Sequence, residues 1–384
     1  LFRSGMGTVY LAEQSEPIRR PVALKVVKLG MDTHQVLTRF ANERQALAMM
    51  DHPNIARIFD AGATAKGRPY FVMEYIEGIP MTQYCDEHRM PIRQRLELFL
   101  AVCSAVHHAH QKGVIHRDIK PSNVLVMERD GVAIPKVIDF GIAKATDQWA
   151  IDRTLLTEFG QMLGTPEYAS PEQAEVTTGD VDESSDVYSL GVLFYELLVG
   201  IVPFDAARMR KAGLSEMLRI IREEEAPALA KRLTSESALD ISARRQTDPA
   251  SLRRLVTGDL NSIAMKALEK ARERRYESAA ALAADVQRHL EHRPVQASPP
   301  DALYRTRKFV ERHRPAVVVS AAALVLLLVS GVALWSFTHR DSLQPKLSEK
   351  DTIVIADFDN KTGDPVFDDT LRQGLSVELQ QSPD

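Results

Sequence analysis

Four polar residues in the middle of the chain have the types and spacing that catalysis with a metal ion requires. The carboxylate of Asp118 stands two residues before the ammonium of Lys120 and five before the amide of Asn123. Asp139 follows 21 residues after Asp118, in the tripeptide DFG. Carboxylate and carbonyl oxygens are the ligands that Mg²⁺ prefers in proteins. Folded together, these groups could accept a proton, hold a metal and offset negative charge at a reacting group.

Transfer of a phosphoryl group makes these demands. The reaction asks a protein mainly to position the reactants and to neutralise charge. One carboxylate must orient the attacking hydroxyl and accept its proton, and oxygen ligands must hold Mg²⁺. A cation near the transferred group then offsets the charge that develops on it. The four side chains include a group for each of these tasks.

The motif HRDIKPSN at 116–123, followed by DFG, resembles the signature of the eukaryotic-type (Hanks-type) protein kinases, in particular bacterial serine/threonine kinases. The resemblance implies that Asp118 is the catalytic base and Lys120 the transition-state cation. Asn123 and Asp139 then hold Mg²⁺ or Mn²⁺, ATP is the phosphoryl donor, and serine and threonine hydroxyls of proteins are the acceptors. The implied fold class is α+β: a two-lobed kinase fold with a small β-rich amino-terminal lobe and a larger helical carboxy-terminal lobe.

Upstream motifs resemble the nucleotide site of this family. Lys25, in VALK, matches the lysine that holds the α- and β-phosphates, and Glu43, in RFANERQAL, matches its glutamate partner. Met73 resembles the gatekeeper, and backbone groups of Glu74 and Ile76 resemble the hinge that bonds adenine. The other ATP contacts that the resemblance implies are Leu1, Gly5, Gly7, Val9, Ala23 and Leu125.

The glycine-rich loop departs from the family pattern G-x-G-x-x-G-x-V. Phe2 and Ser4 stand where the first two glycines belong, whereas Gly7 and Val9 match. Glycine lets backbone N–H groups approach phosphates closely, so this departure motivates an alternative: a pseudokinase that acts as a membrane scaffold with impaired nucleotide binding. A small-molecule kinase is disfavoured by GTPEYASPEQ at 164–173, which resembles the peptide-docking end of an activation segment.

Several further residues match structural supports of the family. Thr165 in the docking segment is a choice typical of serine/threonine kinases. Glu172 and Arg275 match an ion pair of the family, and Asp186, in DVYSLG, matches the buried aspartate that braces the catalytic loop. Arg117 precedes the base, which in this family marks kinases switched by phosphorylation of the activation loop.

Two threonines are the candidate phosphosites of that loop. Thr157 is preferred because it lies eight residues before Thr165, and Thr154 is the second candidate. A phosphate there would give Arg117 a dianionic partner and order the loop. Phosphorylation in trans further suggests a homodimer.

The pattern of apolar residues indicates the elements that must position these groups. Strands rich in β-branched and aromatic residues are predicted at 8–12, 21–29, 55–61 and 70–75, with one helix at 35–50. From Ile92 onward, apolar residues recur at three- and four-residue steps, which is typical of an amphipathic helix. Residues 189–199 are apolar nearly all round, so that helix should be buried.

Residues 316–337 form an uncharged stretch of 22 residues, 12 of them Val, Leu or Phe. As a helix it would span ~33 Å, enough to cross the hydrocarbon core of a bilayer. Arg305, Arg307, Lys308, Arg312 and Arg314 crowd its amino-terminal side, whereas Arg340, Lys346 and Lys350 are spread more thinly beyond it. The positive-inside rule therefore places residues 1–314 in the cytoplasm of a single-pass protein of the inner (plasma) membrane.

The expected domains are a kinase domain at 1–295 with lobes 1–76 and 77–295, a basic juxtamembrane linker at 296–315, the transmembrane helix at 316–337, and the start of an extracytoplasmic module at 338–384. That last segment weakly resembles α/β modules of the periplasmic Tol type. The chain lacks an initiator methionine, so a fragment of a longer protein, or a sequence with a misplaced start, is expected. The net charge of −4 gives no basic field that would point to nucleic acid. Two cysteines without metal-ligand spacing are typical of a reducing compartment.

Overall fold

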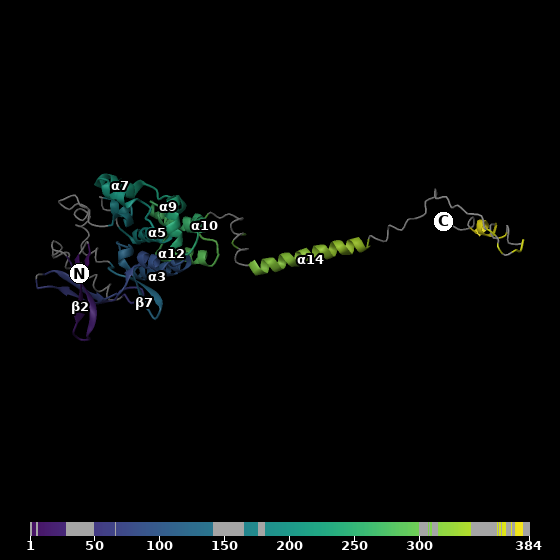
Figure 1. Cartoon of the computed structure of the whole chain (residues 1–384). Helices are drawn as coiled ribbons and strands as arrows, with labels where there is room; N and C mark the ends of the chain where they lie inside the picture. The colour runs from purple at the N-terminus through teal and green to yellow at the C-terminus, as the bar shows by residue number, and fades with distance from the viewer. Residues whose placement is uncertain are drawn as a thin grey trace. The chain divides into compact units, whose positions relative to one another are not determined.

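The computed structural model describes residues 2–4, 7–27, 50–65, 67–140, 165–175, 181–298, 306, 308, 314–338, 359, 361, 363–365, 370 and 373–378. The chain divides into two units, residues 1–314 and 315–384, and each is described by itself (Figure 1). The helix predicted at 35–50 falls outside the described residues except at Met50.

Within the described residues, a five-stranded antiparallel sheet forms the amino-terminal lobe. Its strand order is β1 (Phe2–Ser4), β2 (Gly7–Gln14), β3 (Arg20–Val27), β5 (Pro69–Glu74) and β4 (Ile58–Ala63). The register pairs Val9 with Lys25 and Ala23 with Met73. Because paired residues share a face and side chains alternate along a strand, these four side chains lie on one face of the sheet. The sheet thus gathers four of the residues that the sequence assigned to a nucleotide site.

One predicted strand begins later than expected. Residues 55–61 were predicted as a strand, but β4 starts at Ile58. The chain before it pairs with the second sheet instead, because Val137 N–H donates to Asn54 O (2.8 Å) and Ala56 N–H donates to Val137 O (3.0 Å). Ile55, 1% exposed, is apolar because it is buried at this junction. The other three predicted strands agree with β2, β3 and β5 to within two residues over their described parts.

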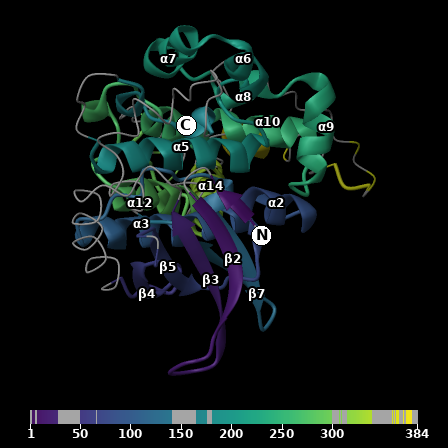
Figure 2. The ribbon, with the colours of Figure 1, turned by 90° about the vertical axis from the view of Figure 1, so that its left-hand side faces the viewer.

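Helices α3 (Ile92–Gln111) and α5 (Glu183–Val199) form the centre of the carboxy-terminal lobe (Figure 2). The rings of Phe99 and Phe194 pack 5.1 Å apart between them, and each buried side chain of this size contributes roughly 1.5–3 kcal/mol. As predicted, the side chains between 189 and 199 are buried, apart from a half-buried Glu196. Asp182 caps the start of α5 by accepting from Ser184 N–H, and Gly200 ends it at a φ of 74°.

Shorter helices surround this pair. They are α2 (Met81–Glu87), α6 (Ala206–Lys211), α7 (Leu214–Glu223), α8 (Leu229–Arg232), α9 (Ser235–Ala243), α10 (Pro249–Thr257), α11 (Asp259–Ala267) and α12 (Ala279–Leu290). The predicted arrangement of a β-rich lobe followed by a helical lobe is confirmed.

A second, small sheet contains the hairpin that lies between the HRDIKPSN and DFG motifs in the chain. It consists of β6 (Ile79–Pro80), β7 (Val124–Arg129) and β8 (Val132–Val137). A 3₁₀ turn, Pro121–Asn123, leads from the HRDIKPSN motif into β7. The DFG tripeptide begins at Asp139, two residues after the last residue of β8. The β7–β8 hairpin therefore brings together two motifs that are 21 residues apart in the sequence.

Helix α14 (Arg314–Thr338) agrees with the predicted membrane-spanning stretch. Its part from Val319 to Thr338 is long and apolar enough to cross a bilayer, with a mean hydropathy of 2.2. Its large apolar side chains, such as Leu327, are exposed. A helix that is apolar all round and unburied is suited to a lipid environment.

Candidate active site

Two side chains of the HRDIKPSN motif, Lys120 and Asn123, converge on the carboxylate of Asp118. Lys120 Nζ lies 2.8 Å from Oδ1 and 2.7 Å from Oδ2 of Asp118. Asn123 Nδ2 donates to the backbone oxygen of Asp118 (2.7 Å) and to its Oδ2 (2.9 Å). Charge-assisted hydrogen bonds of this kind are strong and fix geometry. The side chain of Asp118 is therefore held in one orientation and remains 37% exposed.

A fully buried aspartate shapes the backbone before this carboxylate. Asp186, at the start of α5, accepts from the N–H groups of His116 (2.7 Å) and Arg117 (2.8 Å), and lies 2.8 Å from His110 Nε2. Arg117 has a φ of 67°, a left-handed conformation that costs ~1–3 kcal/mol for a residue with a side chain. The hydrogen bonds to Asp186 stabilise that conformation, as expected for an aspartate that braces the loop containing Asp118.

His116 links the two motifs. Its Nδ1 accepts from Asp118 N–H (3.2 Å), so its Nε2 carries a hydrogen and donates to Ile138 O (2.9 Å). Its ring also packs 4.7 Å from the ring of Phe140. The imidazole therefore connects the backbone of the catalytic loop to the residue before Asp139.

The amino-terminal lobe contributes a lysine to the same region. Lys25 Nζ, on β3, lies 2.9 Å from Asp139 Oδ2, and the side chains are 2% and 14% exposed. Asp139 also has a left-handed φ, 65°. Glu43, the expected partner of Lys25, lies outside the described residues.

The donor set fits a hard divalent cation. Asp139 offers carboxylate oxygens, and Asn123 can offer only its amide oxygen because its nitrogen donates to Asp118. Mg²⁺ and Mn²⁺ both accept such oxygen ligands. The residues present could therefore hold the metal that the sequence predicted.

The hinge residues lie at the end of β5 and directly after that strand. Met73 and Ile76 are buried. The carboxylate of Glu74 binds Lys136 Nζ (3.0 and 3.1 Å) and accepts from Arg57 N–H (3.1 Å). The side chain of Glu74 therefore ties the end of β5 to β8, and its backbone is the part that could meet a base. Of the other predicted contacts, Leu125 is half-buried on β7, whereas Leu1 and Gly5 lie outside the described residues.

Gly7 has a packing reason to be glycine. A Cβ on Gly7 would lie 2.5 Å from Val26 O on the neighbouring strand. Main-chain atoms cannot move aside at low cost, so a side chain does not fit here. Its match to the glycine motif therefore reflects contact with β3 at least as much as any approach to phosphate.

The predicted pair of Glu172 and Arg275 is present and buried. Arg275 donates from Nη1 to Oε1 (2.7 Å) and from Nη2 to Oε2 (2.8 Å) of Glu172. Burial alone would raise the pKa of Glu172, but the hydrogen bonds from Arg275 outweigh it and lower that pKa to about 2. Thr165 is exposed at the start of this segment, and the phosphosite candidates Thr154 and Thr157 lie outside the described residues.

Sequence reasoning gave no role to Gln173, which bridges the docking segment and the catalytic loop. Its Nε2 donates to Arg117 O (2.6 Å), and its Oε1 accepts from Ser170 N–H (2.9 Å). An amide can donate and accept at once, which a carboxylate cannot do. The presence of an amide side chain at position 173 was the only feature of the sequence that could have indicated this bridging role.

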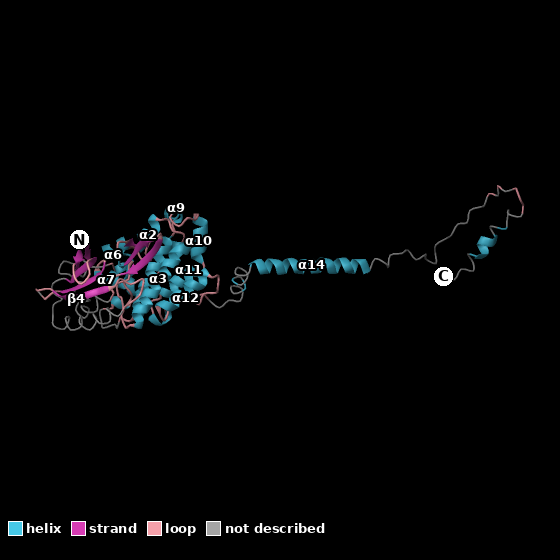
Figure 3. Ribbon diagram, turned by 90° about the horizontal axis from the view of Figure 1, so that it is seen from below, coloured by secondary structure: helices cyan, strands magenta, loops and turns pink. Residues whose placement is uncertain are grey.

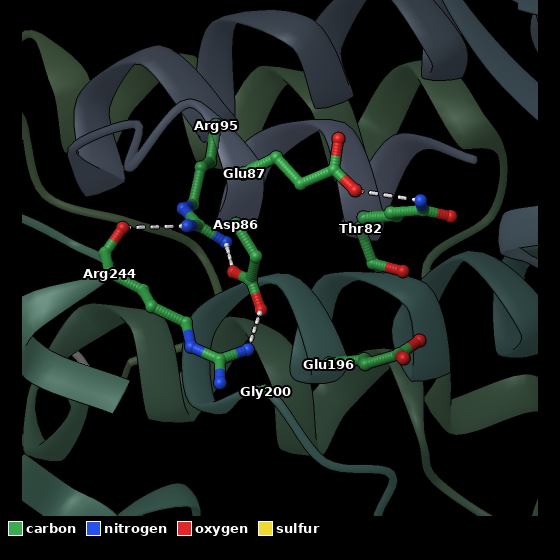
Figure 4. Close-up of a pocket in the computed structure, with 8 residues that line it drawn as sticks. Thr82, Asp86, Glu87, Arg95, Glu196, Gly200 and Arg244 are labelled. Atoms are coloured by element: carbon green, nitrogen blue, oxygen red, sulfur yellow. Dashed lines mark hydrogen bonds and ion pairs between the residues drawn. The ribbon is translucent and has the colours of Figure 1, made fainter. Parts of the chain in front are cut away.

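A second charged region was also missed. A cavity of about 400 Å³ lies between α2, α5 and the end of α9, with Arg95, Asp86, Arg244 and Glu196 among its lining residues (Figure 4). Asp86 binds Arg95 (2.7 Å) and Arg244 (3.3 Å), so its single negative charge offsets part of the positive charge of the two guanidinium groups. Burial raises the pKa of Glu196 to about 7, and Tyr168 donates its hydroxyl to that carboxyl. In the sequence, Glu196 is recognisable only as a polar residue within an otherwise apolar helical segment.

Known proteins resemble this chain in sequence and in fold. A model of the family described as "Protein kinase domain" matches residues 3–289. The serine/threonine-protein kinase PknB of Mycobacterium leprae is 35% identical over 300 residues, which cover 76% of this chain and 42% of that protein. Pkn1 of Myxococcus xanthus is 35% identical over 283 residues, which cover 73% of this chain and 36% of that protein.

A crystal structure of the Mycobacterium tuberculosis PknI kinase domain superposes with a TM-score of 0.53 at 25% identity, covering 76% of this chain and 93% of that one. The chain spans about two fifths of the length of the curated relatives it matches.

Proposed function

Because this chain belongs to the protein kinase family, we propose that it is a serine/threonine protein kinase that transfers the γ-phosphate of ATP to hydroxyl groups of proteins. Members of the family use ATP and a divalent metal. The observation that carries the proposal is the convergence of Asp118, Lys120 and Asn123, together with the cross-lobe pair of Lys25 and Asp139. The two groups are joined because Ile138 N–H, next to Asp139, donates to Asn123 O (2.9 Å). These are the groups that phosphoryl transfer needs in one place.

Each residue has a proposed task. Asp118 orients the substrate hydroxyl and accepts its proton, and the hydrogen bond from Asn123 holds that carboxylate in position. Lys120, bound to both oxygens of Asp118, offsets negative charge on the transferred group. Asn123 and Asp139 would hold Mg²⁺ or Mn²⁺, which when bound supplies positive charge at the phosphate oxygens.

Lys25 is proposed to bind the α- and β-phosphates of ATP. Its ammonium is almost completely buried and needs a counter-charge, which Asp139 supplies. Phosphate oxygens can take over that role when the nucleotide enters. The side chains on the same sheet face, Val9, Ala23 and Met73, would then contact the base and sugar.

The remaining assignments concern regulation and location. We infer that Thr157 or Thr154 is phosphorylated in trans within a homodimer, with Arg117 as the partner of the phosphate. We also infer that residues 1–295 form the kinase domain in the cytoplasm, that 296–315 form the linker, that 316–337 cross the inner membrane once, and that 338–384 begin an extracytoplasmic module. The supports are helix α14 and the five basic residues at 305–314, before the predicted span, against three at 340–350, after it.

Autophosphorylation of the full chain with Mg-ATP, compared with Asp118→Asn, tests the catalytic proposal. Loss of a positioned base lowers the rate ~10²- to 10⁴-fold. Mass spectrometry of the product reports whether Thr154 or Thr157 carries phosphate. Equal rates in the two proteins would remove the catalytic assignment and favour the scaffold alternative.

A further inference from the structure

A lysine of the segment before α14 binds a buried carboxylate of the carboxy-terminal lobe. Lys308 Nζ lies 2.6 Å from Asp259 Oδ2, and only 11% of the lysine side chain and 6% of the aspartate side chain are exposed. Asp259 is the first residue of α11, where the partial positive charge of a helix start favours a carboxylate. An ion pair shielded in this way is screened little by salt.

His289 also contacts this carboxylate. Its Nδ1 lies 3.1 Å from the same oxygen of Asp259. It belongs to α12, which lies beside α11 (Figure 3). Two neighbouring helices of the lobe therefore present one buried acceptor, and the linker supplies the cation that binds it.

A second buried carboxylate fixes the start of the same segment. Asp285 of α12 is fully buried and accepts from the N–H groups of Gln296 (2.8 Å) and Ala297 (2.9 Å). It also accepts from the hydroxyl of Tyr276 (2.9 Å) and binds Arg288 (2.8 Å). The chain beyond α12 is thus attached to the lobe at Gln296 and Ala297, and also at Lys308.

We propose that Asp259, His289 and Lys308 form a latch that holds the segment before α14 against the carboxy-terminal lobe. With the latch closed, six peptide steps separate Lys308 from Arg314 at the start of α14, a reach of at most ~20 Å. Ala297 is held by Asp285 whether the latch is open or closed, and the 17 steps from Ala297 to Arg314 allow a reach of up to ~60 Å. The latch therefore sets how far the lobe can move from the proposed membrane helix, independently of catalysis.

A longer tether changes which partners the lobe can meet. A threefold greater reach enlarges the volume that a tethered domain explores and lowers its effective concentration toward a target on the same membrane. Opening the latch would favour distant targets at the expense of near ones. This consequence rests on the proposed membrane anchorage, whereas the latch itself does not.

Limited proteolysis of the full chain in detergent micelles tests the latch. Chymotrypsin cleaves after aromatic residues, and Tyr304 lies between the two points of attachment. Charged hydrogen bonds at a shielded site should favour the closed latch over the open one by an equilibrium factor of roughly 10–100. We expect cleavage after Tyr304 to become ~10- to 100-fold faster in Lys308→Met and in Asp259→Asn.

A double variant and a control separate the latch from a general effect. If the two residues act as one unit, Asp259→Asn/Lys308→Met is cleaved no faster than the faster single variant. Glu291→Gln, which neutralises an exposed carboxylate just after α12, should be cleaved at the wild-type rate. Wild-type cleavage of Lys308→Met, or additive effects in the double variant, would overturn the proposal. Should Asp259→Asn unfold the lobe, Lys308→Met alone decides.

Discussion

Removal of Arg275 should destabilise the kinase domain more than removal of any exposed arginine. Arg275 forms a bidentate pair with Glu172, and the two side chains are 0% and 3% exposed. Taking away one partner of a buried pair leaves an uncompensated charge, which costs ~3–5 kcal/mol. At about 2 °C for each kcal/mol, Arg275→Met should lower the melting temperature by ~6–10 °C at pH 7.

The pH dependence gives a second measure of the same pair. The folded-state pKa of Glu172 is about 2, against an ordinary value of 4.5, because hydrogen bonds from Arg275 outweigh burial. A lowered carboxyl pKa stabilises the fold at pH values above 4.5, here by roughly 3 kcal/mol, and that stabilisation is lost as the pH falls from about 4.5 to 2. The difference in unfolding free energy between wild type and Arg275→Met should therefore narrow over this interval.

The double variant provides the decisive comparison. Glu172→Gln/Arg275→Met removes both charges, so it should be more stable than Arg275→Met alone. Arg219→Met is the matched control, because Arg219 also forms a bidentate pair, with Glu216, but at an exposed site where the loss of an ion pair costs little. Equal losses in Arg275→Met and Arg219→Met, or a double variant less stable than Arg275→Met, would refute this reasoning.

Three further outcomes are expected. Gly7→Ala should lower stability by ~1–3 kcal/mol in thermal melts, because its Cβ would lie 2.5 Å from Val26 O. Glu196→Gln should gain up to ~3 kcal/mol over wild type as the pH rises from 4.5 to about 7 in denaturant titrations, because burial raises the pKa of Glu196 and its ionisation opposes folding. Leu327→Arg at the centre of α14 should reduce membrane insertion, at a cost of roughly 3 kcal/mol, in alkaline extraction of membranes.

The sequence predicted those parts of the fold and site that depend on local pattern. Strand alternation located β2, β3 and β5, and the apolar run at 189–199 located the buried part of α5. Motif spacing identified Asp118, Lys120 and Asn123, which the catalytic loop brings together. Such features are determined by residues close in the chain, so a single sequence discloses them.

Three features that depend on long-range packing were not predicted from the sequence. The apolar residue Ile55 was assigned to a strand of the first sheet, but it is buried at a bridge to Val137, 82 residues away. Two other contacts likewise join distant segments: the hydrogen bond from Gln173 to the backbone of Arg117, and the ion pair of Lys308 with Asp259. None has a local pattern, because a buried polar group is defined by the partner it finds in the fold.

The pairing of Lys25 with Asp139 explains how a lysine that is proposed to bind a nucleotide can be buried without great cost. An ammonium that is 2% exposed is tolerated only next to an anion, and Asp139 supplies that anion from the other lobe. In the proposed reaction the phosphates of ATP would replace Asp139 as the partner of Lys25, and a bound metal would replace Lys25 as the partner of Asp139. Each group would thus exchange one partner for another of the same charge. Until then the contact between Lys25 and Asp139 holds both side chains near the positions that the proposed phosphoryl transfer requires.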